Sequence, residues 1–207
     1  MTLVLASTSP RRYQILSLLN LPFLMVSPGG SEVVTEGHSP AEEALFQARR
    51  KATSLAVRFP KAVLIGSDTL ISFEGAKIGK PRDLSGARDI LRRMRGRTHE
   101  VVTAAAMMKG DHTFETVKTA QVHMREFSDP EREAYLATGD SLDKAGAYSV
   151  QGLGRSLIDG MDGDYLAVVG LPLRAVADGL RQFGVDVPAD LDRLYRERDF
   201  LNWRTFD

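Results

Sequence analysis

Apolar and polar residues follow two different periodicities along the first half of the chain. Residues 3–6 form a short apolar run, and apolar residues then recur at helical spacing over 10–19. The alternation repeats, with apolar runs at 23–26 and 62–67 and a helical pattern from 40 to about 57. Short apolar runs that alternate with amphipathic helices are typical of an α/β protein.

The order of elements changes in the second half. Residues 100–108 and 113–125 flank a Lys109-Gly110-Asp111 turn, which predicts a long antiparallel hairpin. Residues 149–171 are strand-like and rich in glycine, and Pro172 begins a last core helix that ends at Gly184. We therefore expect an α/β fold in which flanking helices cover a mixed, twisted sheet.

Helix starts carry recognisable capping residues. A serine or aspartate side chain that precedes a helix can accept a hydrogen bond from a backbone N–H of the first turn. Glutamate three residues later completes a capping box. The candidate caps are Ser9, Ser39, Asp83 and Ser128, and proline follows within two positions at three of them.

Composition narrows the class of protein. The 207 residues are 43% hydrophobic and 26% charged, as in an ordinary globular protein, and they suggest one sizeable domain. The 27 basic and 27 acidic residues give zero net charge, which argues against a general nucleic-acid binder. The absence of cysteine excludes thiolate catalysis and disulfides. We expect a cytoplasmic protein, because no leader or membrane-length apolar run is visible.

Arginines nevertheless crowd one predicted helix and its ends. They are Arg82, Arg88, Arg92, Arg93, Arg95 and Arg97. This cluster could bind nucleic acid, but Asp89 and Arg93 have the spacing of an ion pair on one helix face. With no net positive charge, a solvated helix face is the favoured interpretation.

The first strand runs into two arginines at the start of a helix. Arg11 and Arg12 lie in the first turn, where the helix dipole already contributes positive charge. Cations in that position suggest an anion in front of them, since helix N-termini bind anions. The alternative is a solvated surface pair.

Three further residues are candidates for chemistry on phosphates. Asp68 follows the apolar strand at 62–67, where sites gather in α/β sheets, although it could be a turn residue. Lys80 is held extended between glycine and proline and could contact phosphate, or lie in a surface turn. Glu32 is an ordinary acid unless the fold brings it near Asp68. Two carboxylates among cations would suit a divalent metal that bridges phosphates.

Six motifs in this order resemble the Maf family of nucleoside triphosphate pyrophosphatases over about residues 3–184. They are Leu5-Ala6-Ser7-Thr8-Ser9-Pro10-Arg11-Arg12, Gly66-Ser67-Asp68-Thr69, Gly79-Lys80-Pro81, Thr98-His99-Glu100-Val101-Val102-Thr103, Asp143-Lys144-Ala145-Gly146-Ala147-Tyr148 and Gly170-Leu171-Pro172-Leu173. The resemblance implies a Maf/ITPase-like fold. It also implies hydrolysis of a nucleoside triphosphate to the monophosphate and pyrophosphate, with a divalent cation, Mg or Mn.

The resemblance also implies residue roles. Asp68 is the expected catalytic acid/base, and Glu32 and Asp68 are the expected metal partners. The expected triphosphate contacts are Ser7, Arg12, Lys51 and Lys80. Arg11, Thr69 and Gln151 match the subgroup that acts on dTTP and UTP, whereas the 7-methyl-GTP subgroup carries Trp, Gln and Glu at these positions. Family members are commonly homodimers, and the family is associated with arrest of septum formation.

Two departures leave alternatives open. The family usually has aspartate where this chain has Ser31, and often asparagine where it has Ala167. The Ala167 departure could broaden the substrate range to modified nucleotides. A nucleotide-sensing or nucleic-acid-binding regulator of division is the other alternative. Residues 185–207 lie outside the resemblance, and 189–198 could form a charged amphipathic helix.

Overall fold

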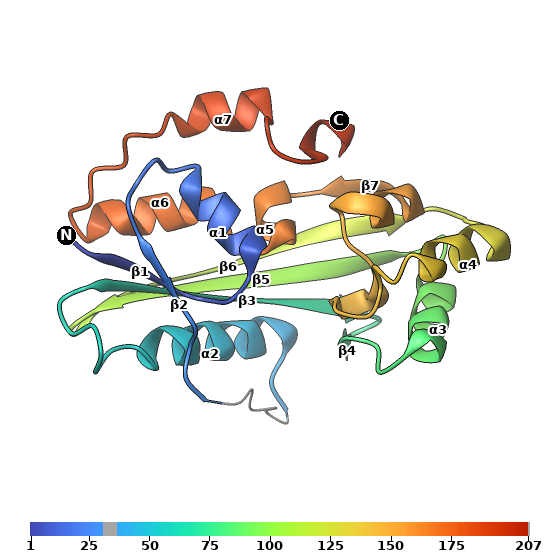
Figure 1. The fold of residues 1–207 in the computed structure, drawn as a ribbon, viewed down its shortest axis with the longest axis horizontal. Coiled ribbons are helices and arrows are strands. Elements are labelled where there is room, and N and C mark those ends of the chain that lie inside the picture. The colour runs from blue at the N-terminus through green and yellow to red at the C-terminus, as the bar shows by residue number, and fades with distance from the viewer. Residues whose placement is uncertain (31–36, 207) are drawn as a thin grey trace. The chain divides into compact units, whose positions relative to one another are not determined.

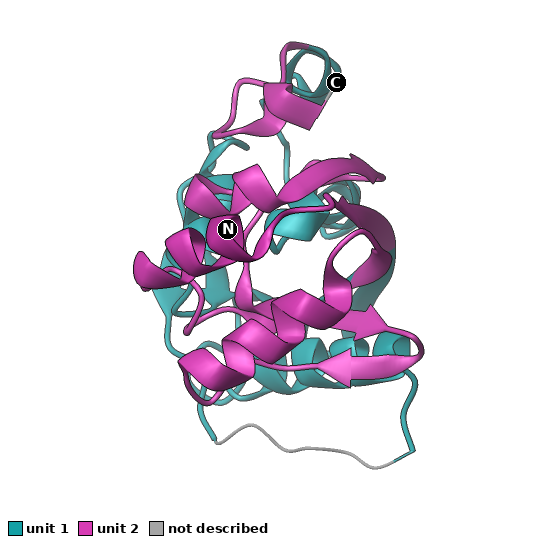
Figure 2. Ribbon diagram, turned by 90° about the vertical axis from the view of Figure 1, so that its right-hand side faces the viewer, with its two compact units in different colours: residues 1–69, 102–118, 166–196 teal, residues 70–101, 119–165, 197–207 magenta. Residues whose placement is uncertain are grey.

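The computed structural model describes residues 1–30 and 37–206, which form two compact units. Unit 1 contains residues 1–69, 102–118 and 166–196, and unit 2 contains 70–101, 119–165 and 197–207 (Figure 2). Hydrogen bonds link the strands in the order β2-β1-β3-β5-β6-β7, and β4 pairs with β3. Parallel pairs at β1 and antiparallel pairs at β4 and β7 confirm the expected mixed sheet.

Unit 1 holds the parallel part of the sheet. β1 (Leu3–Ala6) lies between β2 (Leu24–Val26) and the first half of β3 (Val63–Phe73), and both neighbours are parallel to it. Figure 1 shows α2 (Pro40–Thr53) along one face of these strands and α1 (Pro10–Ser17) and α6 (Leu173–Gln182) along the other. Helices on both faces bury the parallel strands, which explains their continuous apolar runs.

The packing of α2 onto the sheet is a backbone-to-backbone contact. A Cβ atom added at Gly66 of β3 would lie 2.1 Å from the Ala48 carbonyl oxygen and 2.8 Å from the Ala52 nitrogen. Glycine is required because the helix lies directly against the strand there. Buried apolar residues fill the surrounding layer, namely Val4, Ala6, Ala52, Leu55, Ala62 and Leu64.

Unit 2 contains helices and short strands from the middle of the chain. α3 (Leu84–Met94) and α4 (Asp129–Ala137) are its helices, and β4 (Ala76–Ile78) and β7 (Ile158–Asp162) are its short strands. The predicted hairpin is confirmed as β5 (Thr98–Lys109) and β6 (His112–Met124), whose residues divide between the two units.

The predicted caps are confirmed at all four helix starts. Ser9, Ser39, Asp83 and Ser128 each accept a hydrogen bond from a first-turn backbone N–H, and Ser39 and Ser128 form complete capping boxes. The local sequence therefore determines where these helices begin, and with them the places of Arg12 and Lys51.

The strand-like prediction for residues 149–171 is wrong except at β7. A 3₁₀ turn occupies Gly152–Leu157, and Tyr165–Val169 forms the short helix α5. A short, wholly apolar run does not distinguish a buried helix from a buried strand, and residues 165–169 are such a run. Further along the chain, α7 (Leu191–Glu197) occupies part of the C-terminal segment in which a helix was expected.

Candidate active site

Polar side chains of unit 1 gather where β3 extends beyond its parallel partner. β1 pairs with β3 only as far as Gly66, so Ser67, Asp68 and Thr69 continue past the carboxyl end of β1. The sequence placed Asp68 after a strand, whereas the structure places it inside the longer β3. The position still lies at the carboxyl end of a parallel pair, where sites form in α/β sheets.

Asp68 is paired with Lys51 from the last turn of α2. The Lys51 ammonium donates to the Asp68 carboxylate, and the side chains remain 13% and 12% exposed. The apolar face of α2, with Ala48 and Ala52 against β3, places Lys51 at this height of the strand. A charge pair with little solvent around it interacts more strongly than a surface pair. The structure thus brings the expected acid/base into direct contact with an expected phosphate ligand.

Arg12 is fixed by two contacts inside unit 1. Its Nε donates to the Gly170 carbonyl oxygen at 2.9 Å, and its Nη2 donates to Thr69 Oγ1 at 3.3 Å. Gly170 has a φ of 137°, which only glycine adopts readily, and a Cβ atom there would lie 3.5 Å from Arg12 Nε. These contacts hold the planar guanidinium in one orientation.

Two buried hydroxyls, for which the sequence predicted no role, complete this arrangement. Ser67 Oγ lies 2.8 Å from the Ala104 oxygen and 3.0 Å from the Gly170 oxygen. Thr103 Oγ1 lies 3.0 Å from Thr69 Oγ1 and 2.8 Å from the Ala167 oxygen. Both residues lie in motifs that carry the family resemblance. This is the signal by which the sequence could have identified them as site residues.

The site residues divide between the two faces of β3. Consecutive side chains of a strand point to opposite faces. Asp68 accordingly contacts Lys51 of α2, while Thr69 contacts Arg12 of α1, and these helices cover opposite faces (Figure 1). The structure therefore connects Arg12, an expected triphosphate ligand, to Thr69, an expected base-selecting residue, rather than to Asp68.

Ser7 shapes the turn that leads into α1. It is 4% exposed, and its Oγ accepts a hydrogen bond from the Ser9 N–H at 3.0 Å. Ser9 Oγ in turn accepts from the Arg12 N–H at 3.4 Å. Arg11 is half-buried beside Arg12. The strand end, the cap and both arginines thus form one continuous unit of local structure.

Lys80 and Gln151 belong to unit 2. Lys80 is exposed in a non-helical loop, as expected, and the preceding Gly79 carbonyl accepts from the Gly146 N–H at 3.2 Å. Gln151 is 8% exposed, and its backbone N–H donates to Ser149 Oγ at 3.1 Å. Its buried Nε2 finds no hydrogen-bond partner among the described residues. An unpaired buried amide is costly, so this donor suits a ligand carbonyl.

The expected metal partner Glu32 lies outside the described residues. Among those that the structure does describe, no group of three histidines or carboxylates is arranged to hold a metal ion. Asp68 is the expected ligand whose position is known, at the carboxyl end of β1 and β3.

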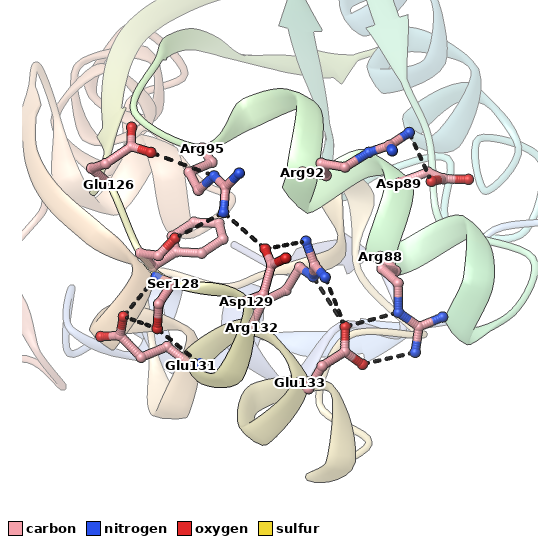
Figure 3. A network of polar contacts seen from close by, with 11 residues as sticks. Arg88, Asp89, Arg92, Arg95, Glu126, Ser128, Asp129, Glu131, Arg132 and Glu133 are labelled. Atoms are coloured by element: carbon pink, nitrogen blue, oxygen red, sulfur yellow. Dashed lines mark hydrogen bonds and ion pairs between the residues drawn. The ribbon is translucent and has the colours of Figure 1, made fainter.

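Within unit 2, carboxylates pair with Arg88 and Arg92 of α3 and with Arg95 at its end (Figure 3). Arg88 donates through two nitrogens to Glu133, each at 2.8 Å, and these hydrogen bonds lower the pKa of Glu133 to about 2. Arg95 lies 2.9 Å from Asp129, and Arg92 lies 3.3 Å from Asp89. The expected pair of Asp89 with Arg93 is wrong, because Asp89 contacts Arg92 and the Arg93 guanidinium lies over the Phe73 ring. The paired arginines form a solvated ionic network.

Comparisons with known proteins agree on one family. A family model described as Maf-like protein matches residues 2–183. A dTTP/UTP pyrophosphatase of Symbiobacterium thermophilum is 39% identical over 185 residues, which cover 89% of this chain and 95% of that protein. A dTTP/UTP pyrophosphatase of Dictyoglomus turgidum is 40% identical, with 88% of this chain and 96% of that protein covered.

One solved structure, the Ham1 protein of Staphylococcus aureus, is 14% identical with a TM-score of 0.49. The match covers 77% of this chain and 81% of that chain.

Proposed function

Because this chain belongs to the Maf family, we propose that it hydrolyses dTTP and UTP to the monophosphate and pyrophosphate. The observation that carries the proposal is the Lys51–Asp68 pair at the carboxyl end of β1 and β3. The pair combines a carboxylate that can act on water with a cation that can act on phosphate. The names of the relatives support the choice of dTTP and UTP.

The reaction requires charge neutralisation more than covalent catalysis. Water attacks the α-phosphorus, the bond to the bridging oxygen breaks, and pyrophosphate leaves. Arg12, Lys51 and Lys80 offset the negative charge on the phosphates, and Ser7 is a further proposed phosphate contact. Asp68 orients the water and takes up its proton.

Base selection is assigned to Arg11, Thr69 and Gln151. A uracil or thymine edge presents both acceptors and a donor, and the glutamine amide can donate and accept. The unpaired Gln151 Nε2 supports this role, because a base carbonyl would satisfy it. The contact between Thr69 and Arg12 supports a coupling of base selection to phosphate binding.

We propose that a divalent cation, Mg²⁺ or Mn²⁺, takes part. Magnesium in nucleotide enzymes is usually held by one or two carboxylates together with substrate phosphates, and Asp68 with Glu32 fits that donor set. When bound, the ion would neutralise charge on the phosphate oxygens.

A nucleotide panel with product analysis tests the function. The enzyme is assayed with Mg²⁺ or Mn²⁺ on dTTP, UTP, CTP, 7-methyl-GTP and ITP. We expect dTTP and UTP to be the best substrates, with monophosphate and pyrophosphate as products. Release of inorganic phosphate and diphosphate would overturn attack at the α-phosphorus. If ITP or 7-methyl-GTP were the best substrate, the assignment to pyrimidine nucleotides would be replaced. The alternative suggested by Ala167, a pyrophosphatase with a broader substrate range, would take its place.

We also propose that the chain forms a homodimer. β2 lies at the end of the strand order and exposes Leu24 (51%) and Met25 (41%), and Tyr13 of α1 is 46% exposed. An edge strand with exposed apolar side chains is suited to contact with a second copy. Light scattering after size exclusion should give twice the 22.8 kDa chain mass, and a constant monomer mass would contradict the dimer.

A further inference from the structure

The C-terminal segment at residues 197–206 lies beyond the matched region, which ends at residue 183, yet it contributes to unit 2. Its 3₁₀ turn at Trp203–Phe206 packs against the segment at 150–158, which contains Gln151. The family match does not account for this packing.

Aromatic contacts pack the C-terminal segment against Tyr165. The ring of Trp203 stacks on Tyr165 with centroids 5.5 Å apart and planes 13° apart, and Trp203 is 5% exposed. Phe206 contacts the same ring at 5.5 Å, and the Tyr165 hydroxyl donates to the Leu201 carbonyl. Stacked aromatic pairs add to the stabilisation from area burial, so this end of the chain is a packed part of unit 2.

Arg155 ties the C-terminal segment to the 3₁₀ turn that follows Gln151. Its Nε donates to Thr205 Oγ1 at 2.8 Å, and its guanidinium lies 4.2 Å from the centroid of Phe206. The same guanidinium donates to the Ile158 carbonyl at the start of β7. One side chain within the turn thus links Thr205 and Phe206 to the start of β7.

Asn202 contacts the backbone on both sides of Gln151. Its Nδ2 lies 3.4 Å from the Val150 oxygen and 3.4 Å from the Gly152 oxygen. Asn202 has a φ of 62°, a conformation that asparagine tolerates better than most residues. The amide can therefore sit between two carbonyls that bracket the proposed base-reading residue.

We propose that Asn202, Thr205 and Phe206 form a positioning element that fixes Gln151 for pyrimidine recognition. A recognition side chain discriminates between bases only when its own support holds it within roughly 0.5 Å of the productive geometry. Asn202 and Arg155 supply that support through the backbone at 150, 152 and 158. The inference rests on the proposed role of Gln151 in base selection.

The sharpest test is Asn202→Asp, which keeps the size and the backbone preference but replaces the amide donor with a carboxylate. We expect the KM for dTTP and UTP to rise about fivefold or more, since two weak hydrogen bonds are lost. The kcat should stay within about twofold, because no group near the phosphates changes. The preference for UTP over CTP, which differs at the base edge, should fall by a similar factor.

Arg204→Ala is the matched control. Arg204 contacts Glu197 and Asp199 within the C-terminal segment itself. This variant should keep wild-type KM and selectivity. An equal change in Arg204→Ala and Asn202→Asp would show a general effect of the segment and overturn the specific role of Asn202.

A double-mutant cycle separates the positioning role of Asn202 from the proposed role of Gln151 in base selection. If Asn202 acts through Gln151, Asn202→Asp in a Gln151→Ala background should produce no further loss of selectivity. Additive losses would overturn the positioning role while leaving the pyrimidine assignment intact. A wild-type enzyme without dTTP or UTP hydrolysis would instead overturn the proposed function. Amide exchange at 150–157 should also be faster in Asn202→Asp than in Arg204→Ala, and equal exchange would contradict the inference.

Discussion

At the residue scale, Asp68 is the group on which the proposed chemistry depends. Asp68→Asn keeps the shape but removes the base, so kcat should fall by roughly 10²–10⁴ with KM little changed. Steady-state kinetics with dTTP measure this. Asp111→Asn, in the exposed hairpin turn, is the matched control and should retain wild-type kcat. A kcat for Asp68→Asn within a few-fold of wild type would exclude Asp68 as acid/base.

His99 provides a second prediction at this scale. Burial lowers its pKa from 6.5 to about 4, and its Nε2 lies 2.6 Å from the Tyr148 hydroxyl. The folded chain holds this histidine neutral, whereas the unfolded chain protonates it below about pH 6.5. Its contribution to stability is thus fully present above pH 6.5 and is lost as the pH falls towards 4.

Urea unfolding at pH 7 and pH 4 measures this effect. The depressed pKa corresponds to roughly 3 kcal/mol of unfolding free energy over that interval. His99→Gln has no ring to titrate, so its unfolding free energy should fall less between the two pH values. An equal fall in both proteins would show that the buried ring is not the source.

The sequence named candidate site residues but did not predict which of them contact one another. Ser7, Arg12, Lys51, Asp68 and Thr69 all lie in unit 1, and Lys51 meets Asp68 directly. Ser67 and Thr103 were given no role, because a hydroxyl near a backbone carbonyl leaves no spacing pattern in the sequence. The link from Arg12 to Thr69 depends on the crossing of α1 over β3, which only tertiary packing determines.

At the element scale, the contact between β3 and α2 controls the position of Lys51. Gly66→Ala would place a Cβ atom 2.1 Å from the Ala48 carbonyl oxygen. We expect a loss of about 1–3 kcal/mol, typical of overpacking, together with lower kcat as α2 is displaced. Thermal unfolding and dTTP kinetics measure both effects. Gly160→Ala in β7 is the control, since its nearest neighbour would be 3.9 Å away. Wild-type stability in Gly66→Ala would contradict the close contact.

Element boundaries were predictable wherever a side chain marks them. The four capped helices begin where serine or aspartate predicted, because each cap satisfies a specific first-turn N–H. The segment at 149–171 carries no such mark. Its apolar residues would be buried in a helix or in a strand, so tertiary packing rather than local preference makes α5 a helix.

At the scale of the whole molecule, charge balance decides between the rival functions. The chain has no net charge, and carboxylates pair with Arg88 and Arg92 of α3 and with Arg95 at its end. We therefore expect no measurable binding of labelled DNA or RNA at 50 mM salt, because a polynucleotide would have to displace these carboxylates. Binding that weakens steeply between 50 and 200 mM salt would support the nucleic-acid-binding regulator instead.

None of the helices in the described parts of the chain combines the length and the apolar character that a bilayer span requires. The longest helix that the structure describes, α2, is amphipathic and packs its apolar face on β3.

The stacked pair of Trp203 and Tyr165 also provides an intrinsic fluorescent probe of the C-terminal segment. Trp203 is the sole tryptophan of the chain, so indole fluorescence arises at one place, beside the segment that carries Gln151. Loss of the stack would expose the indole to water and move its emission to longer wavelength. With no cysteine in the chain, a dye could be attached at any chosen position by introducing one thiol. The seating of the C-terminal segment can then be followed in real time while nucleotide binds.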